Sequence, residues 1–337
     1  MFNFDEANFL KVTRGAVQLR SQIEDVVDSV TAKGYKNLFL LGSGGSIAIM
    51  YPFEYMLKSN STIPVFAEIA AEFVLYDHKH FGPESLVILS SLSGTTKETV
   101  QAAKYCKEKG ATTIGLVGEL GTPLAELSDY CLVNYSENDT ASDSIYLQLY
   151  MLIFKLMEAN GDFPQYKQFA DELEKMPHVL LDVKQQTESQ AEQFAKLYKD
   201  ETYHMLVGSG SVWGETYSYA MCVLEEMQWI RTKSIHAAEF FHGTLELVER
   251  DTSVILMTGE DESRPLMDRV ERFASKYTDK LSIFDTKQYE LKGISEQFRK
   301  FLSPIIIASL FERVSTYLEK ERNHPLSTRR YYRKIEY

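Results

Sequence analysis

Cysteine is scarce in this sequence, and the other features that it lacks narrow the possible functions further. Three cysteines stand far apart in 337 residues, a pattern that indicates neither a disulfide framework nor a zinc site. Acidic residues exceed basic ones, giving a net charge of −12, so nucleic acid is not a default partner. The sequence shows no apolar run of about 18 residues and no N-terminal signal pattern. We therefore expect a cytoplasmic enzyme or sensor, without a membrane partner.

Two parts of the chain alternate strand-like apolar runs with helical segments. In the first part, the runs in KNLFLLGSGGS (36–46) and SLVILSSLSGTT (85–96) each end in a Gly/Ser turn and continue as a helix. Residues 142–200 read as helices, and the segment 202–229 then repeats the pattern of strand, Gly/Ser turn and long helix. Such alternation predicts parallel sheets covered by helices on both faces, here in two degenerate copies of one α/β unit.

The expected organisation has five segments. They are an N-terminal helix (1–33), a first α/β domain (34–165), a helical connector (166–200), a second α/β domain (201–320) and a C-terminal tail (321–337).

The Gly/Ser turns GSGGS (42–46) and SSLSGTT (90–96) are candidate anion sites. Each follows a strand and opens a helix, whose free N–H groups and dipole favour an anion, and Ser91, Ser93 and Thr96 would add hydroxyl donors suited to a phosphate monoester. Neither turn is a Walker loop or a dinucleotide fingerprint. The alternative interpretation is an ordinary turn with helix caps.

The segment LEEMQWIRTKSIHAAEFFHGTLELVE (224–249) holds candidate acid–base residues within an apolar setting. On a helix beginning near Ser218, Glu226 would lie among Leu224, Met227 and Trp229, and partial burial would suit it to act as a base. His242, 16 residues later, would be a partly buried partner that titrates near neutrality. The alternatives are an exposed helix face carrying Glu226 and, for His236, a hydrogen-bonded core histidine.

At this point the motifs resemble a known family. The turns GSGGS and SSLSGTTKETV, with the duplicated plan, resemble proteins with two sugar-isomerase (SIS) domains, such as the isomerase half of glucosamine-6-phosphate synthase. The segments EMQWI, IHAAEFFHGTLELVE, GEDESRPLMDRV and NHPLSTRRYYRKIEY resemble more specifically the fructosamine 6-phosphate deglycases. The resemblance covers essentially the whole chain. It implies two tandem SIS domains, each a flavodoxin-like three-layer sandwich with a parallel sheet between helices.

The resemblance also assigns roles to residues. It places the phosphate loop on Ser91, Ser93 and Thr96, with Gly45 and Ser46 of the first turn close by. It makes Glu226 the residue that shuttles a proton and His242 the residue that opens the sugar ring. In the family this histidine reaches the active site of the neighbouring subunit, which implies at least a homodimer. Less specific candidates for substrate binding are Glu239 and, in the segment that closes over substrate, Arg329, Arg330 and Tyr331.

What the resemblance implies is a deglycase that splits a 6-phosphofructosyl amino acid, such as fructoselysine 6-phosphate, with water into glucose 6-phosphate and free amino acid. No metal or other cofactor is implied. Val223 stands where the synthase carries a lysine, and we expect no amidotransferase domain before the chain, so synthase activity is not expected. Thr244 replaces the family's proline after His242-Gly243, which should leave that loop less rigid.

Three alternatives stay open on the sequence. An aldose–ketose isomerase or an amino-sugar 6-phosphate deaminase would use the same glutamate and phosphate loop, and a sugar-phosphate sensor would use the loop alone. The leaving amino acid is not determined. Residues 260–262 could meet a lysine ammonium but fit a solvated acidic loop better, and Arg264 is ambiguous.

Overall fold

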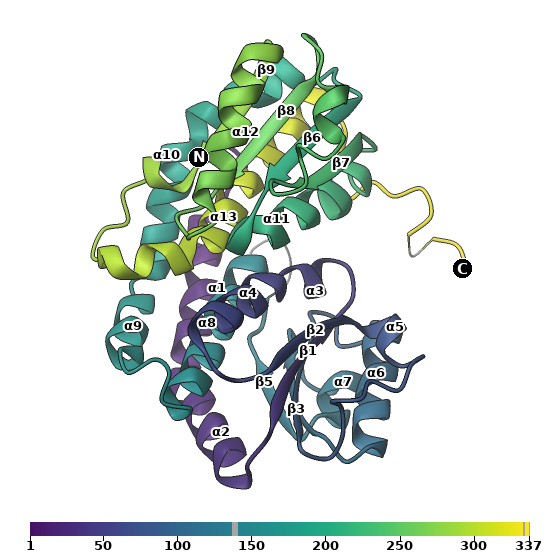
Figure 1. Cartoon of the computed structure of the whole chain (residues 1–337), viewed down its shortest axis with the longest axis vertical. Coiled ribbons are helices and arrows are strands. Elements are labelled where there is room, and N and C mark those ends of the chain that lie inside the picture. The colour runs from purple at the N-terminus through teal and green to yellow at the C-terminus, as the bar shows by residue number, and fades with distance from the viewer. Residues whose placement is uncertain (137–140, 333, 337) are drawn as a thin grey trace. The chain divides into compact units, whose positions relative to one another are not determined.

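The computed structural model describes residues 1–136, 141–332 and 334–336. The chain divides into two compact units, one formed by Glu6–His178 and the other by Met1–Asp5 together with Val179–Tyr337. Each unit is built around one parallel sheet with helices on its faces (Figure 1). This confirms the predicted α/β class with two parallel sheets.

The sheet of the first unit has five strands in the order β2-β1-β3-β4-β5, all parallel to their neighbours. This is the flavodoxin-like order. The strands are β1 (Asn37–Gly42), β2 (Val65–Ile69), β3 (Ser85–Ser91), β4 (Thr112–Val117) and β5 (Tyr130–Val133). Strands β1, β3 and β4 are buried along their whole length, which explains their continuous apolar runs. The edge strand β2 is only partly buried, and the sequence analysis did not predict it.

Helices cover both faces of this first sheet. Phe39, Val87 and Leu89 share a core with Phe73 of α5 and Ala102 of α6, and the alternate side chains point to the other face. The helices are α1 (Glu6–Gln18), α2 (Arg20–Lys33), α3 (Gly45–Ala48), α4 (Tyr51–Asn60), α5 (Ala70–Phe73), α6 (Lys97–Glu108), α7 (Pro123–Leu127), α8 (Ala141–Ala159) and α9 (Tyr166–Leu173).

The predicted single helix at the N-terminus is wrong in one respect. The structure has two helices, α1 and α2, separated at Leu19, whose N–H bonds to the carbonyl of Ala16 three residues back. Arg20 then opens α2 and forms ion pairs with Glu24 and with Asp171 and Glu174 near α9. The break therefore lies where the chain gains contacts with a distant helix.

The sheet of the second unit repeats the order of the first, with one strand fewer. Its four parallel strands follow the order β7-β6-β8-β9, so β6 corresponds to β1 and β8 to β3. The strands are β6 (Tyr203–Gly208), β7 (Arg231–His236), β8 (Ser253–Thr258) and β9 (Lys280–Asp285). The sequence analysis did not predict β7, which follows the helical segment that it expected up to residue 229. Arg231 and Lys233 on this edge strand are exposed, and their charges hide the strand pattern.

The helix α13 (Glu296–Arg322) is the longest of the second unit and forms much of the core of that unit. The other helices of this unit are α10 (Met176–Tyr198), which crosses the division between the units, α11 (Trp213–Ser218) and α12 (Arg264–Tyr277). α12 packs on the sheet through Met267, Val270 and Ala274. α13 is long and apolar enough to cross a membrane by length and composition, but 89% of its apolar window is buried inside the protein. Its apolar character is that of a core helix.

Candidate functional site

The turns after β1 and β3 lie at the same edge of the first sheet, because the carboxyl ends of adjacent parallel strands meet there. Ser46 lies in α3 just after the first turn, and Ser91 ends β3. The Ser91 and Thr96 hydroxyls hydrogen-bond each other at 2.9 Å, and the Thr95 N–H and hydroxyl both bond to Ser93 Oγ, at 3.3 and 3.0 Å. The structure thus gathers several hydroxyls beside the start of α6.

This edge of the sheet also carries polar groups without partners. Among the described residues, the buried hydroxyls of Ser43, Ser90 and Thr99 make no hydrogen bond. Buried polar groups are normally paired. Gly44 holds a φ of +55°, and a Cβ added there would meet nothing within 4 Å. The turn at Gly44 therefore has open space beside its backbone, as an anion site would.

The equivalent turn of the second unit is filled by a side chain. Gly210 holds a φ of +56°, like Gly44, but a Cβ there would fall 2.5 Å from Oδ1 of Asp261. Ser211 donates to the Asp261 carboxylate from its N–H and its hydroxyl, at 2.9 and 2.5 Å, and the Ser263 N–H donates at 2.8 Å. The carboxylate of Asp261 thus lies where the first unit is open.

Glu226 follows a π-helical turn, η2 (Tyr219–Glu225), instead of the α-helix expected there. The Glu226 N–H bonds to the carbonyl of Met221, five residues back, at 3.1 Å. Trp229 then takes the left-handed φ of +56° and ends the helical segment. Such turns are frequent at functional sites because they re-aim side chains.

The C-terminal tail contacts Glu226 directly. Nε of Arg329 lies 2.8 Å from Oε1 of Glu226, with side-chain exposures of 17% and 29%. The guanidinium of Arg330 stacks over the Trp229 ring, 3.9 Å from its centroid. Gln228 anchors the start of the tail, because its side-chain N–H donates to the carbonyl of His324 at 2.8 Å.

Glu226 lines a pocket of about 870 Å³ within the second unit. The predicted tail residues Arg329, Arg330 and Tyr331 line it too, so the structure brings four predicted site residues together. Other lining residues were not singled out from the sequence, among them Glu201, Arg231, Thr232 and Arg322. No local motif marks them, since β7 and the end of α13 come together only in the fold.

His242 and Glu239 do not join this pocket. Both are exposed on the loop after β7, and the predicted partial burial of His242 is wrong. Within the described part of the chain, no hydrogen bond or ion pair links His242 to Glu226. His236 is half-buried, with its ring edge-on to Trp213 at 5.4 Å, and its Nδ1 accepts a hydrogen bond from the Ala238 N–H at 3.2 Å. Burial lowers the pKa of His236.

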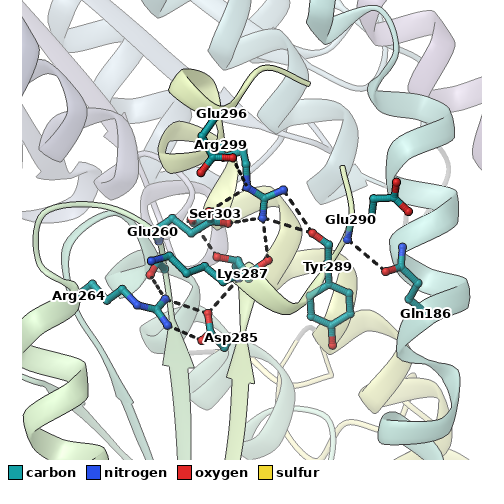
Figure 2. Close-up of polar contacts among 12 residues, drawn as sticks. Gln186, Glu260, Arg264, Asp285, Lys287, Tyr289, Glu290, Glu296, Arg299 and Ser303 are labelled. Atoms are coloured by element: carbon teal, nitrogen blue, oxygen red, sulfur yellow. Dashed lines mark hydrogen bonds and ion pairs between the residues drawn. The ribbon is translucent and has the colours of Figure 1, made fainter. Parts of the chain in front are cut away.

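The acidic segment after β8 is mostly internal (Figure 2). Arg299 binds the buried Glu260 with two hydrogen bonds of 2.8 and 3.0 Å. Arg264 binds Asp285 in the same two-pronged way, at 2.9 and 2.5 Å, and although burial opposes ionisation, this guanidinium lowers the pKa of Asp285. The expectation of a solvated acidic loop is therefore wrong for Glu260 and for the buried Asp261. Only Glu262 is exposed.

Comparisons with known proteins agree with this architecture. The family model described as SIS domain matches residues 34–155. The fructosamine deglycase FrlB of Bacillus subtilis is 33% identical over 97% of this chain and 100% of its own length. The fructoselysine 6-phosphate deglycase of Escherichia coli K12 is 21% identical over 92% of this chain and 89% of its own.

Solved structures share the fold. A Bacillus subtilis protein described as a candidate phosphosugar isomerase superposes with a TM-score of 0.90, at 33% identity, over 99% of this chain and 100% of its own. The C-terminal domain of the Francisella tularensis glucosamine-fructose-6-phosphate aminotransferase superposes with a TM-score of 0.81 over 96% of each chain, at only 13% identity. The chain therefore belongs to the SIS domain family, with two parallel-sheet units of the kind found in tandem SIS phosphosugar isomerases.

Proposed function

We propose that this protein is a fructosamine 6-phosphate deglycase, which converts a 6-phosphofructosyl amino acid and water into glucose 6-phosphate and the free amino acid. The observation that carries the proposal is the 33% identity to a fructosamine deglycase along the full length of both chains. The pocket at Glu226 supports it, because a carboxylate beside open space of this size can reach a sugar carbon.

The proposed roles follow the reaction. The Ser91–Thr96 loop, with Gly45 and Ser46, binds the phosphate, and His242 assists ring opening. Glu226 removes a proton from C1 of the open-chain ketoamine and a proton is returned to C2, which gives an aldimine at C1. Water then hydrolyses the aldimine, and the carbon–nitrogen bond breaks with release of the amine.

We further propose that the enzyme works in the cytoplasm as a homodimer or larger homo-oligomer. The exposure of His242 in the single chain is compatible with its acting in a partner's active site. An isomerase or a deaminase of amino-sugar phosphates is the second candidate, since a glucosamine-6-phosphate deaminase from Thermotoga maritima shares the fold with a TM-score of 0.64 at 16% identity.

The test is release of glucose 6-phosphate from ε-fructoselysine 6-phosphate by the wild-type protein and by Glu226→Gln. We expect release by the wild type and a loss of at least ~10²-fold in the variant, the scale of a lost acid–base group. Glu225→Gln is the matched control. Glu225 is the adjacent carboxylate, exposed and bonded to the Thr232 hydroxyl at 2.5 Å.

The possible outcomes distinguish between the candidate functions and test the role of Glu226. Equal activity in wild type and Glu226→Gln would keep the reaction and remove Glu226 from it. An equal loss in Glu225→Gln would show that the effect belongs to the local structure. If no fructosamine phosphate is cleaved, interconversion of aldose and ketose 6-phosphates and deamination of glucosamine 6-phosphate are the next assays, and binding without turnover would indicate a sensor.

A further inference from the structure

The guanidinium of Arg329 is held in a fixed orientation by its own tail. Nη1 donates to the backbone carbonyls of Leu326, at 2.6 Å, and Thr328, at 2.9 Å. Nε holds Glu226 at 2.8 Å. A guanidinium has five N–H donors, and these contacts use three of them. Among the described residues nothing bonds to Nη2, so two donors of a fixed and partly buried cation stay unused beside the pocket.

The pocket around this cation favours a further anion. Its lining residues include four guanidinium groups and three carboxylates. One of the carboxylates, Glu201, is already paired with Lys280, and Glu226 is paired with Arg329. Arg330 lies on Trp229 and Arg231 is exposed, and no described carboxylate pairs with either. The local excess of positive charge contrasts with the net charge of −12 for the whole chain.

We propose that Nη2 of Arg329 binds the carboxylate of the leaving amino acid while its Nε holds Glu226. The inference rests on the proposed function and names the part of the substrate that this pocket recognises. The N–H donors of a planar guanidinium point in fixed directions, so Nε and Nη2 can hold two carboxylates in a set arrangement, which an ammonium cannot. Arg329 thereby positions the base relative to the amine that departs, and it selects amino acids over simple amines.

The test compares two substrates that differ only in the carboxylate, 6-phosphofructosylglycine and 6-phosphofructosylmethylamine. The wild-type enzyme should prefer the glycine compound in kcat/KM by at least about tenfold, the scale of a charge-assisted contact. In Arg329→Gln this preference should collapse toward one. Loss of Glu226 positioning lowers kcat for both substrates, so the ratio between substrates isolates the carboxylate contact. Arg329→Lys keeps the charge without the fixed donor directions, and its preference should fall between those of the wild type and Arg329→Gln.

A binding measurement keeps the inference separate from the reaction. Dissociation constants for both compounds are measured by calorimetry on the wild type and on Arg329→Gln, after the variant is shown to have an unchanged Tm. The wild type should bind the glycine compound more tightly than the methylamine compound, and Arg329→Gln should bind both about equally. A wild-type ratio near one, or a ratio that survives in Arg329→Gln, overturns the inference. Preferential binding of the glycine compound without turnover supports it and overturns only the proposed function. Binding of neither compound overturns both.

Discussion

The buried ion pair between Glu260 and Arg299 offers a quantitative test of how the second unit is held together. Only 5% of the Glu260 side chain and 12% of the Arg299 side chain are exposed. Arg299 also donates to the carbonyls of Thr286 and Tyr289, each at 3.3 Å, so it ties the loop after β8 to the segment after β9 (Figure 2). Glu260→Gln keeps the shape of the side chain and removes its charge.

The expected cost follows from leaving one charge buried without its partner. Such a removal typically costs 3–5 kcal/mol, and the residual exposure of Arg299 favours the lower end, about 3 kcal/mol. Arg299→Met should cost a similar amount. Replacing both, as in Glu260→Gln with Arg299→Met, should cost much less than the sum of the two single costs, because no uncompensated charge remains.

The assay is denaturant unfolding of the four proteins, read as a double-mutant cycle. Asp279→Asn is the control in the same unit, because the pair Arg250–Asp279 is about 70% exposed on both sides and should contribute almost nothing. A loss below about 1 kcal/mol in Glu260→Gln would refute the reasoning. So would additive costs in the double variant, since the two side chains would then not be coupled.

Two further predictions concern a buried histidine and a turn glycine. Burial, with Arg322 and Lys280 nearby, lowers the pKa of His204 to about 4. Between pH 6.5 and 4, His204 is therefore protonated in the unfolded state and neutral in the folded state. The free energy of unfolding should therefore fall by about 2 kcal/mol from pH 7.5 to pH 5. In His204→Gln, the free energy of unfolding should depend less on pH, and an unchanged dependence would contradict this. Gly94→Ala should destabilise the first unit, because Gly94 holds a φ of +61° and its Cβ would overlap Thr122. Gly121→Ala has a similar φ of +72° and open space, so it should cost only the backbone strain of about 1–2 kcal/mol, and equal Tm losses in the two variants would rule out the overlap.

The parallel sheets could be predicted because their central strands are buried on both faces and are therefore continuous apolar runs. The edge strands β2 and β7, which were not predicted, behave differently. In β7, the charged residues Arg231 and Lys233 alternate with side chains that are half-buried or buried, and only the pairing with β6 identifies the segment as a strand. The division at Leu19 likewise depends on a contact with Asp171, more than a hundred residues away in sequence.

The candidate site shows the same limit more sharply. Glu226 could be chosen from its apolar neighbours, but the π-helical turn that aims it has no sequence pattern of its own. The ion pair with Arg329 joins residues that are far apart in the chain, so the sequence could suggest Arg329 only through the family resemblance. The prediction for the 260–262 segment failed because charge alone does not show whether a carboxylate faces water or a buried arginine such as Arg299.

The two units also explain why one fold can carry different chemistry in its two copies. Gly44 and Gly210 have nearly the same positive φ, and each lies two residues after the first strand of its copy. Above Gly44 the space is open and hydroxyls gather at Ser91–Thr96, whereas above Gly210 the Asp261 carboxylate already accepts three hydrogen bonds. An anionic ligand at Gly210 would be repelled by the negative charge of the Asp261 carboxylate or would have to displace it. The two equivalent turns therefore differ in what occupies them: the turn at Gly44 is open beside a hydroxyl loop, and the turn at Gly210 already holds a carboxylate from an acidic segment.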